Sequence, residues 1–304
     1  MPVNQNKPGK GWLRDLPDFR DLSVDSAVAP SKLAALGQKP VKEMLRAAGV
    51  GPKAAAKLPA TADLRQWCSP IEDQGNIGSC TAHAGVGMVE YFERRASGKH
   101  VDASRRFLYK VTRNFMQVTG DTGAYLRSTM GALTLFGVPP ESYWAYDEAK
   151  YEEEPPAFCY AFAQNYQAVS YYRLDPPGAA ADVVLGRIKT NLAAGLPSMF
   201  GFTVYSSISQ ADKTGRIPFP TTKDAVDGGH AIMAVGYDDA MKIKNVSKGG
   251  VETKGALLIR NSWSAGWGEK GYGWLPYDYV LRGLAVDWWS LLKGEWVDTG
   301  EFKV

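Results

Sequence analysis

The pattern of apolar residues changes period near the middle of this 304-residue chain, and this change limits the possible folds more than any other feature. From about residue 80 to residue 137, apolar residues recur at helical spacing, in segments that end in glycine. Beyond residue 166, short and nearly continuous apolar runs such as 231–237 are typical of buried strands. A helical half followed by a sheet half predicts an α+β protein with two lobes.

We expect a helical lobe over residues 59–165 and a β-rich lobe over residues 166–304. The expected helices span 80–95, 104–113, 128–137 and 180–194, and the expected strands span 168–174, 198–204, 231–237, 256–260 and 272–275. The lysine-bearing stretch 238–254 is interpreted as an exposed hairpin, and the acidic run 152–154 as a solvated surface.

Residues 1–58 differ in character from both lobes. Residues 11–21 mix apolar and charged side chains around a proline, which predicts an extended segment. A helix is expected over 31–48, broken or bent at Pro40 because proline lacks the backbone N–H that a helix needs. A linker follows over 49–59. Two interpretations stay open, an ordinary N-terminal subdomain and a pro-segment-like arm that covers a cleft.

Charge and hydropathy exclude several classes of protein. The 35 basic and 32 acidic residues give a formal net charge of +3 without a basic stripe, so no nucleic-acid partner is implied. No apolar run reaches the length of a membrane span, and the first residues lack the apolar core of a secretory signal. We expect a monomer that is cytoplasmic, or secreted by a route that needs no signal peptide.

The chain has three cysteines, Cys68, Cys80 and Cys159. An odd and low count is not a disulfide framework and is typical of free thiols in a reducing compartment. A single bridge between Cys68 and Cys159 stays open as an alternative.

Cys80 has a sequence context that suits a nucleophile. Residues 74–80 read Gln-Gly-Asn-Ile-Gly-Ser-Cys and open an amphipathic segment in which Ser79 is a candidate helix N-cap. The positive field of a helix N-terminus lowers the pKa of a thiol. Gln74 can direct an amide N–H to the same point, as an oxyanion donor would. A buried and inert cysteine is the commoner use of such a position.

Three histidines compete for the role of general base. His100 follows a Gly-Lys pair and is expected at the surface. His83 lies three residues after Cys80 on the same helix, which is a poor position for serving both nucleophile and leaving group, and no further ligands at metal spacing accompany it. We therefore expect His83 to be structural and no metal to bind. His230 follows a glycine-rich turn at the start of a buried strand, a rigid position that suits a general base.

Asn261 ends the next buried strand, where its amide oxygen can accept a hydrogen bond from an imidazole, and Trp263 can shield that bond from water. The block 261–272 reads Asn-Ser-Trp-x-x-Gly-Trp-Gly-x-x-Gly-Tyr. With the stretch that ends at Cys80 and the Gly-Gly-His before the strand, this block resembles the papain-like cysteine peptidases over residues 59–290.

The resemblance implies a papain-like fold, with a helical left lobe, an antiparallel and barrel-like right lobe and the active-site cleft between them. It implies that Cys80 is the nucleophile, His230 the base, Asn261 the residue that orients the base and Gln74 the oxyanion donor. A looser part of the alignment implies substrate-binding residues. These are Gly123 and Ala124, which would bind an extended substrate backbone, Tyr125 beside them, and Gly201 and Ala231 in the pocket for the second residue before the scissile bond.

Several residues depart from the family pattern. Ile77 and Asp121 stand where most eukaryotic members have a disulfide pair, which fits a reduced protein. Thr81 replaces the usual tryptophan and Gly229 the usual acidic or asparagine residue, without loss of a catalytic atom. These differences, and a first segment of only 58 residues, resemble a bacterial member of the family, of the xylellain type.

The expected function is that of a cysteine endopeptidase that needs no cofactor, forms a thioester acyl-enzyme on peptide or protein substrates and is restrained by its N-terminal segment. Two other classes stay open. One is an acyltransferase or deamidase that uses the same Cys-His-Asn site, and the other is a non-catalytic papain-like binding protein.

Overall fold

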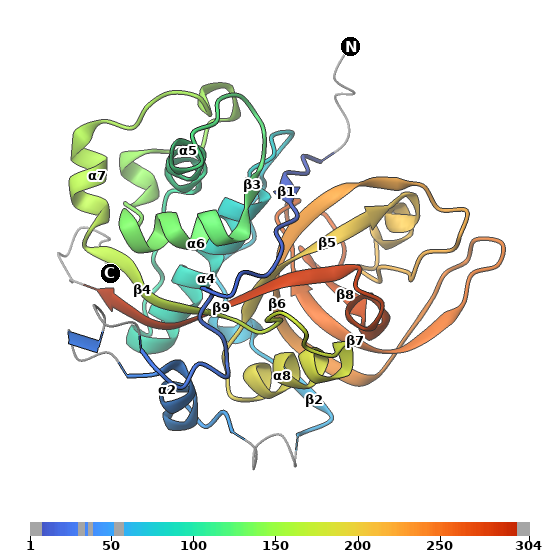
Figure 1. The fold of residues 1–304 in the computed structure, drawn as a ribbon. Helices are drawn as coiled ribbons and strands as arrows, with labels where there is room; N and C mark the ends of the chain where they lie inside the picture. The colour runs from blue at the N-terminus through green and yellow to red at the C-terminus, as the bar shows by residue number, and fades with distance from the viewer. Residues whose placement is uncertain (1–7, 30–33, 36–38, 52–57, 297–304) are drawn as a thin grey trace.

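The computed structural model describes residues 8–29, 34–35, 39–51 and 58–296. Figure 1 shows a group of helices on one side, a large curled sheet on the other, and the N-terminal segment passing between them. The helices are α2 (Val41–Ala47), α4 (Cys80–Ser97), α5 (Arg105–Phe115), α6 (Leu126–Leu135), α7 (Ala157–Ala163), α8 (Ala181–Ala193) and α9 (Tyr277–Leu281). The strands are β1 (Trp12–Leu13), β2 (Thr61–Asp63), β3 (Ala124–Tyr125), β4 (Tyr166–Arg173), β5 (Ser198–Tyr205), β6 (Val226–Lys244), β7 (Glu252–Arg260), β8 (Tyr272–Pro276) and β9 (Ala285–Trp296).

Helix α4 forms the centre of the helical lobe and joins it to the sheet. Its first three turns are completely buried, and it ends at Gly98, whose φ of 76° is the left-handed conformation that glycine adopts most easily. Gly87 allows the helix to approach the sheet closely, because a Cβ there would lie 2.7 Å from both Met233 and Arg260. The start of α4 is thereby fixed against strands β6 and β7.

The large sheet has seven antiparallel strands in the order β4-β9-β5-β6-β7-β8, with β2 paired to β6. The long strand β6 pairs with β5 on one side and β7 on the other, so the residues that follow His230 lie beside the residues that precede Asn261. The edge of β8 is covered by residues 215–217, which exchange two backbone hydrogen bonds with Trp274. The predicted α+β class, with helices preceding a large antiparallel sheet, is confirmed.

The predicted helices and strands of the two lobes are present, with ends that differ by a few residues, and stretch 238–254 forms the β6–β7 hairpin as expected. Strand β9, helices α7 and α9 and strand β2 were not predicted. Strand β9 has no alternation of apolar and polar residues, because both of its faces are largely buried: Trp288 and Trp289 point to opposite sides and neither is exposed. Consecutive buried tryptophans do not produce a strand pattern.

The acidic run 152–154 is not a merely solvated surface, as its composition suggested. Glu152 forms ion pairs with Arg113 and Lys110, and Glu154 accepts hydrogen bonds from Asn114 and Tyr160. These carboxylates neutralise the basic residues of helix α5, whose side chains are nearly buried.

The first segment agrees with the predicted break at proline, since α2 begins directly after Pro40. Parts of the predicted helix 31–48 and of the linker 49–59 lie outside the described residues. Strand β1 pairs in parallel with β3 of the helical lobe, and the chain then runs along β4, where Arg173 donates its backbone N–H to Leu22. We call residues 8–26 the N-terminal arm.

All three cysteines are free thiols, so the alternative of a Cys68–Cys159 bridge is wrong. Among the described residues, no helix combines the length and hydrophobicity needed to cross a membrane.

Candidate active site

Cys80 is the first residue of α4, with Ser79 at the N-cap position. The expectation that the Ser79 side chain caps the helix is wrong, because its hydroxyl bonds instead to the Tyr146 hydroxyl at 2.7 Å and approaches Nδ1 of His83. The Cys80 thiol is completely buried, and burial raises its pKa to about 11. The backbone N–H groups of Ala231 and Gly11 oppose this effect and lower the pKa of the thiol.

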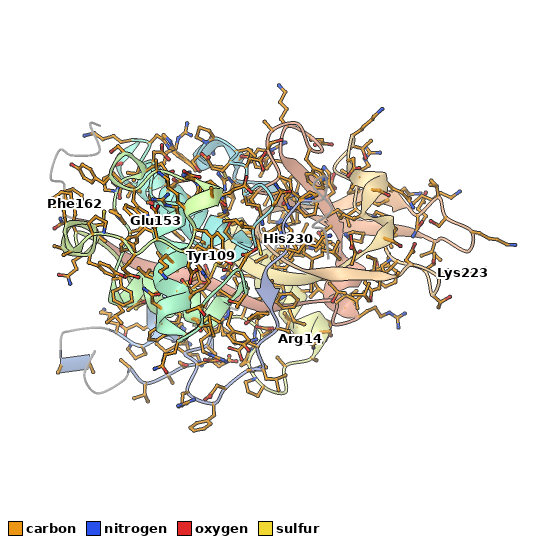
Figure 2. The ribbon with its side chains drawn as sticks, turned by 90° about the horizontal axis from the view of Figure 1, so that it is seen from above. Arg14, Tyr109, Glu153, Phe162, Lys223 and His230 are labelled. Carbon is orange, nitrogen blue, oxygen red and sulfur yellow. The ribbon has the colours of Figure 1, made fainter. Side chains whose placement is uncertain are left out.

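His230 lies within strand β6 and not at its start, because the strand continues through Gly228 and Gly229, which pair with β5. Nε2 of the ring is 2.8 Å from Oδ1 of Asn261, and Trp263 stacks on the ring with centroids 4.5 Å apart. Figure 2 shows His230 near the middle of the molecule, between the helices and the sheet. Within the described part of the chain, Nδ1 has no hydrogen-bond partner.

The hydrogen bond to Asn261 determines which nitrogen of His230 carries the proton. An amide oxygen only accepts, so Nε2 donates and Nδ1 is left as the basic nitrogen. Oδ1 of Asn261 also accepts from the backbone N–H of Ser262 at 2.8 Å, which fixes the orientation of the amide. Burial lowers the pKa of His230 to about 4, and the bond to Asn261 opposes this shift.

The Gln74 side chain is completely buried. Its Oε1 accepts a hydrogen bond from the Ser262 hydroxyl at 2.6 Å, which directs the NH₂ group away from that side. Nε2 donates to the carbonyl of Gly9 and to that of Ile77, both at 3.0 Å. The amide expected to hold an oxyanion therefore holds a carbonyl of the N-terminal arm.

The arm also contacts four of the five residues that were expected to bind substrate. Gly11 accepts the backbone N–H of Ala124 at 2.8 Å, and a Cβ at Gly123 would overlap Gly11. Leu13 pairs with Tyr125, and a Cβ at Gly201 would overlap the ring of Trp12. Ala231, the fifth of these residues, pairs with Gly201 across strands β5 and β6.

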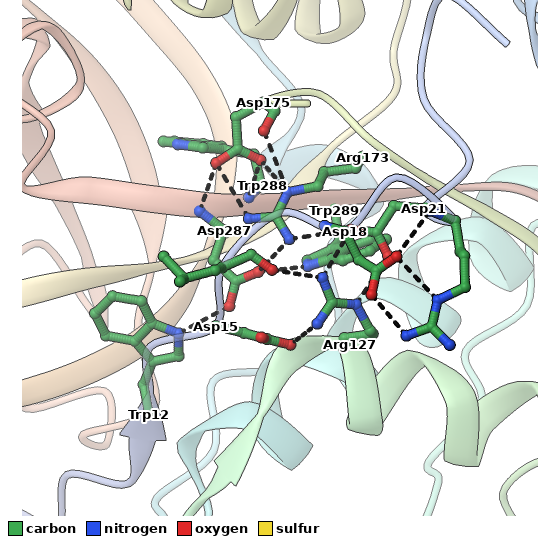
Figure 3. Close-up of polar contacts among 12 residues, drawn as sticks. Trp12, Asp15, Asp18, Asp21, Arg127, Arg173, Asp175, Asp287, Trp288 and Trp289 are labelled. Carbon is green, nitrogen blue, oxygen red and sulfur yellow. Dashed lines mark hydrogen bonds and ion pairs between the residues drawn. The ribbon is translucent and has the colours of Figure 1, made fainter. Parts of the chain in front are cut away.

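Two residues that the sequence did not indicate complete this pocket. Trp12 is 7% exposed and donates from Nε1 to Oδ2 of Asp287 at 3.1 Å, as Figure 3 shows. Asp287 is completely buried and also accepts from Nε1 of Trp289 and pairs with Arg173 at 3.2 Å. Burial raises the pKa of Asp287 to about 6, and Arg173 opposes the shift. No sequence signal marked Asp287, because it lies on the unpredicted strand β9.

His83 is buried, and its Nδ1 lies 3.1 Å from the backbone oxygen of Ser79. Burial lowers the pKa of His83 to about 3, so its ring is neutral at physiological pH. His100 is exposed, as expected. In the ranges that the structure describes, no group of His, Cys, Asp and Glu side chains is arranged to hold a metal ion.

Known proteins share sequence and fold with this chain. A sequence profile described as papain family cysteine protease matches residues 58–280. An uncharacterised peptidase C1-like protein of Acanthamoeba polyphaga mimivirus is 31% identical over 290 residues, which cover 92% of this chain and 86% of that protein. Cathepsin K of Gallus gallus is 27% identical over 73% of this chain and 60% of its own. The crystal structure of xylellain, a cysteine protease from Xylella fastidiosa, superimposes with a TM-score of 0.72 at 31% identity, covering 96% of this chain and 98% of that chain.

Proposed function

The chain belongs to the papain family of cysteine proteases and is a cysteine peptidase, and we propose from its site that it is an endopeptidase restrained by its own N-terminal arm. The observation that carries the proposal is that Gln74, the candidate oxyanion donor, binds the carbonyl of Gly9, while the backbone N–H of Gly11 lies close enough to the Cys80 thiol to lower its pKa. The arm thus occupies the polar groups that a substrate would need.

The residues of the site support hydrolysis through an acyl-enzyme. Nδ1 of His230 accepts the thiol proton of Cys80, and the sulfur then attacks the substrate carbonyl carbon. The negative charge on the carbonyl oxygen is stabilised by Nε2 of Gln74 and the backbone N–H of Cys80. When the tetrahedral intermediate collapses, the C–N bond breaks and His230 gives its proton to the leaving amine. His230 then takes a proton from water, whose oxygen attacks the thioester and releases the acid and the thiol.

Asn261 keeps the imidazole in the useful tautomer during these steps, since its oxygen accepts the Nε2 proton whether Nδ1 is neutral or protonated. Trp263 covers this hydrogen bond and removes it from water, which strengthens it.

The direction of the arm explains why it blocks the site without serving as substrate. In the family alignment, a substrate runs from the pocket at Gly201 toward Cys80. The arm runs from Gly9 and Gly11, near Gln74 and Cys80, to Trp12 over Gly201, which is the opposite direction. Its peptide carbonyls are therefore not presented to the sulfur in the order that cleavage requires.

The arm also holds the catalytic pair in an unreactive protonation state. With the arm in place Cys80 and His230 are completely buried, and burial raises the pKa of the thiol and lowers that of the imidazole. Both effects favour the neutral thiol and neutral ring over the thiolate–imidazolium pair. Removal of the arm admits water and favours the reactive ion pair.

The proposal is tested by comparing hydrolysis of a fluorogenic peptide panel by the full-length chain and by a chain that begins at Lys57. We expect faster hydrolysis by the shortened chain and none by its Cys80→Ala variant. Equal rates would mean that the arm is structural. Transfer of acyl groups to amines, or release of ammonia from glutamine side chains without cleavage of the peptide, would favour the acyltransferase or deamidase alternatives.

A further inference from the structure

Carboxylates hold the loop that leads to the nucleophile. We call residues 74–79 the nucleophile loop. Three of its backbone N–H groups each donate to an acidic side chain. The pairs are Gly75 with Asp73 at 2.9 Å, Asn76 with Glu148 at 2.7 Å and Gly78 with Asp121 at 2.8 Å.

Asp121 differs from the other two acids, because the oxygen that accepts from the nucleophile loop also accepts from a residue on the side of the site where a substrate would bind. Its Oδ1 also accepts the hydroxyl of Tyr109, a completely buried residue of α5. The Tyr109 oxygen in turn accepts the backbone N–H of Gly123 at 3.2 Å. A continuous chain of hydrogen bonds therefore connects Gly78 with Gly123, which belongs to the substrate strip formed by Gly123 and Ala124.

Little space separates the nucleophile loop from the substrate strip. A Cβ at Gly78 would lie 3.3 Å from the Cα of Gly123 and 3.1 Å from that of Gly11. Gly123 itself has a φ of 72°. A small shift of the nucleophile loop relative to the strip would consequently change the space between Cys80 and a bound backbone.

We propose that Asp121 is a positioning residue that couples the nucleophile loop to the substrate strip. The inference rests on the proposed function and assigns no chemistry to Asp121 itself. A hydrogen bond to an ionised acceptor is about twice as strong as a neutral one, so one carboxylate can hold both donors. Ile77 and Asp121 stand where the family alignment places a disulfide pair. The carboxylate would provide the same connection without depending on the redox state.

The test compares full-length variants, each made alone and together with Trp12→Ala so that the arm does not conceal the effect. Asp121→Ala should lower kcat/KM for a four-residue peptide about tenfold, the size expected for one charge-assisted hydrogen bond that water partly replaces. It should also slow alkylation of Cys80 by iodoacetamide severalfold. Asp121→Asn should retain most of the wild-type kcat/KM and of the wild-type alkylation rate, because an amide oxygen still accepts hydrogen bonds.

The Tyr109→Phe variant tests the substrate strip separately from the nucleophile loop. It leaves the Asp121–Gly78 bond in place and removes the hydroxyl that connects Asp121 with Gly123. We expect a higher KM for the four-residue peptide, with unchanged kcat and unchanged alkylation of Cys80. Asp182→Ala, at an exposed position in the first turn of α8, is the matched control and should change none of these values.

Unchanged kcat, KM and alkylation rate per titrated thiol in Asp121→Ala would overturn the proposal, even if thermal stability falls. If Asp121→Ala does not fold, Tyr109→Phe still decides, and a wild-type KM for the four-residue peptide in that variant would overturn the proposal. If no variant cleaves any peptide, the proposed function fails. In that case the alkylation rates still test, independently of peptide cleavage, whether Asp121 is coupled to Cys80.

Discussion

Replacement of Trp12 by alanine should release the arm and expose the nucleophile. A tryptophan side chain buries about 200 Å², which corresponds to about 5 kcal/mol at about 25 cal/mol per Å². Because Trp12 is only 7% exposed, nearly all of this area is removed from water. Partial burial of the ring in the released arm reduces the effect, and we expect a loss of about 3–4 kcal/mol in docking free energy. The open fraction should therefore rise a few hundredfold, since about 1.4 kcal/mol is a factor of ten.

The assay is the rate of Cys80 alkylation by iodoacetamide, followed by mass spectrometry, with peptide hydrolysis measured in parallel. Cys68 and Cys159 are buried and give an internal reference within the same chain. Phe19→Ala is the matched control, because Phe19 is an aromatic residue of the same arm that is 92% exposed. The chain beginning at Lys57 defines the rate of the fully open site.

Trp12→Ala should accelerate both reactions toward that upper value, whereas Phe19→Ala should leave them at the wild-type rate. The reasoning is refuted if the folded Trp12→Ala chain reacts as slowly as wild type while the shortened chain reacts quickly. In that case the ion pairs of the arm, such as Asp21 with Arg127, hold it in place without the indole.

Three further predictions follow from the site and the core. Asn261→Ala should lower kcat by about 10- to 100-fold with little change in KM, because the imidazole loses its orienting partner; an unchanged kcat would show that Trp263 alone holds the ring. Glu90 is unexposed and bonds to Arg105 at 3.1 Å and to the hydroxyl of Ser69. Its replacement by alanine should lower the free energy of unfolding, measured with denaturant, by about 3–5 kcal/mol; a loss under about 1 kcal/mol would contradict a buried pair. His83 has a folded pKa of about 3 against 6.5 for a free histidine, so the unfolded state binds more protons between these values and stability is lost as pH falls below about 6.5. At pH 5 this loss is at most about 2 kcal/mol, and unfolding of His83→Gln at pH 7 and pH 5 should show a smaller difference than wild type.

Local sequence determined the elements that carry the proposed catalytic groups. Helix α4 begins at Cys80 and ends at Gly98 because a Gly-Ser pair precedes a long amphipathic segment and glycine follows it. The apolar runs after His230 and before Asn261 form adjacent strands because the stretch between them folds back as a hairpin. These features depend on contacts within a few residues or between neighbouring strands, which periodicity and turn residues encode.

Tertiary structure alone decided what these groups contact. Trp12 and Asp287 are 275 positions apart, and Gln74 and Gly9 are 65 apart, so no local pattern predicts either hydrogen bond. The sequence left open whether the first segment was a subdomain or an arm over the cleft, because an extended stretch with one tryptophan fits both. The packing of two lobes creates a pocket in which that indole is buried and its N–H meets a carboxylate. Burial of Cys80 in this packing raises the pKa of its thiol, an effect opposite to the one that its helix position predicts.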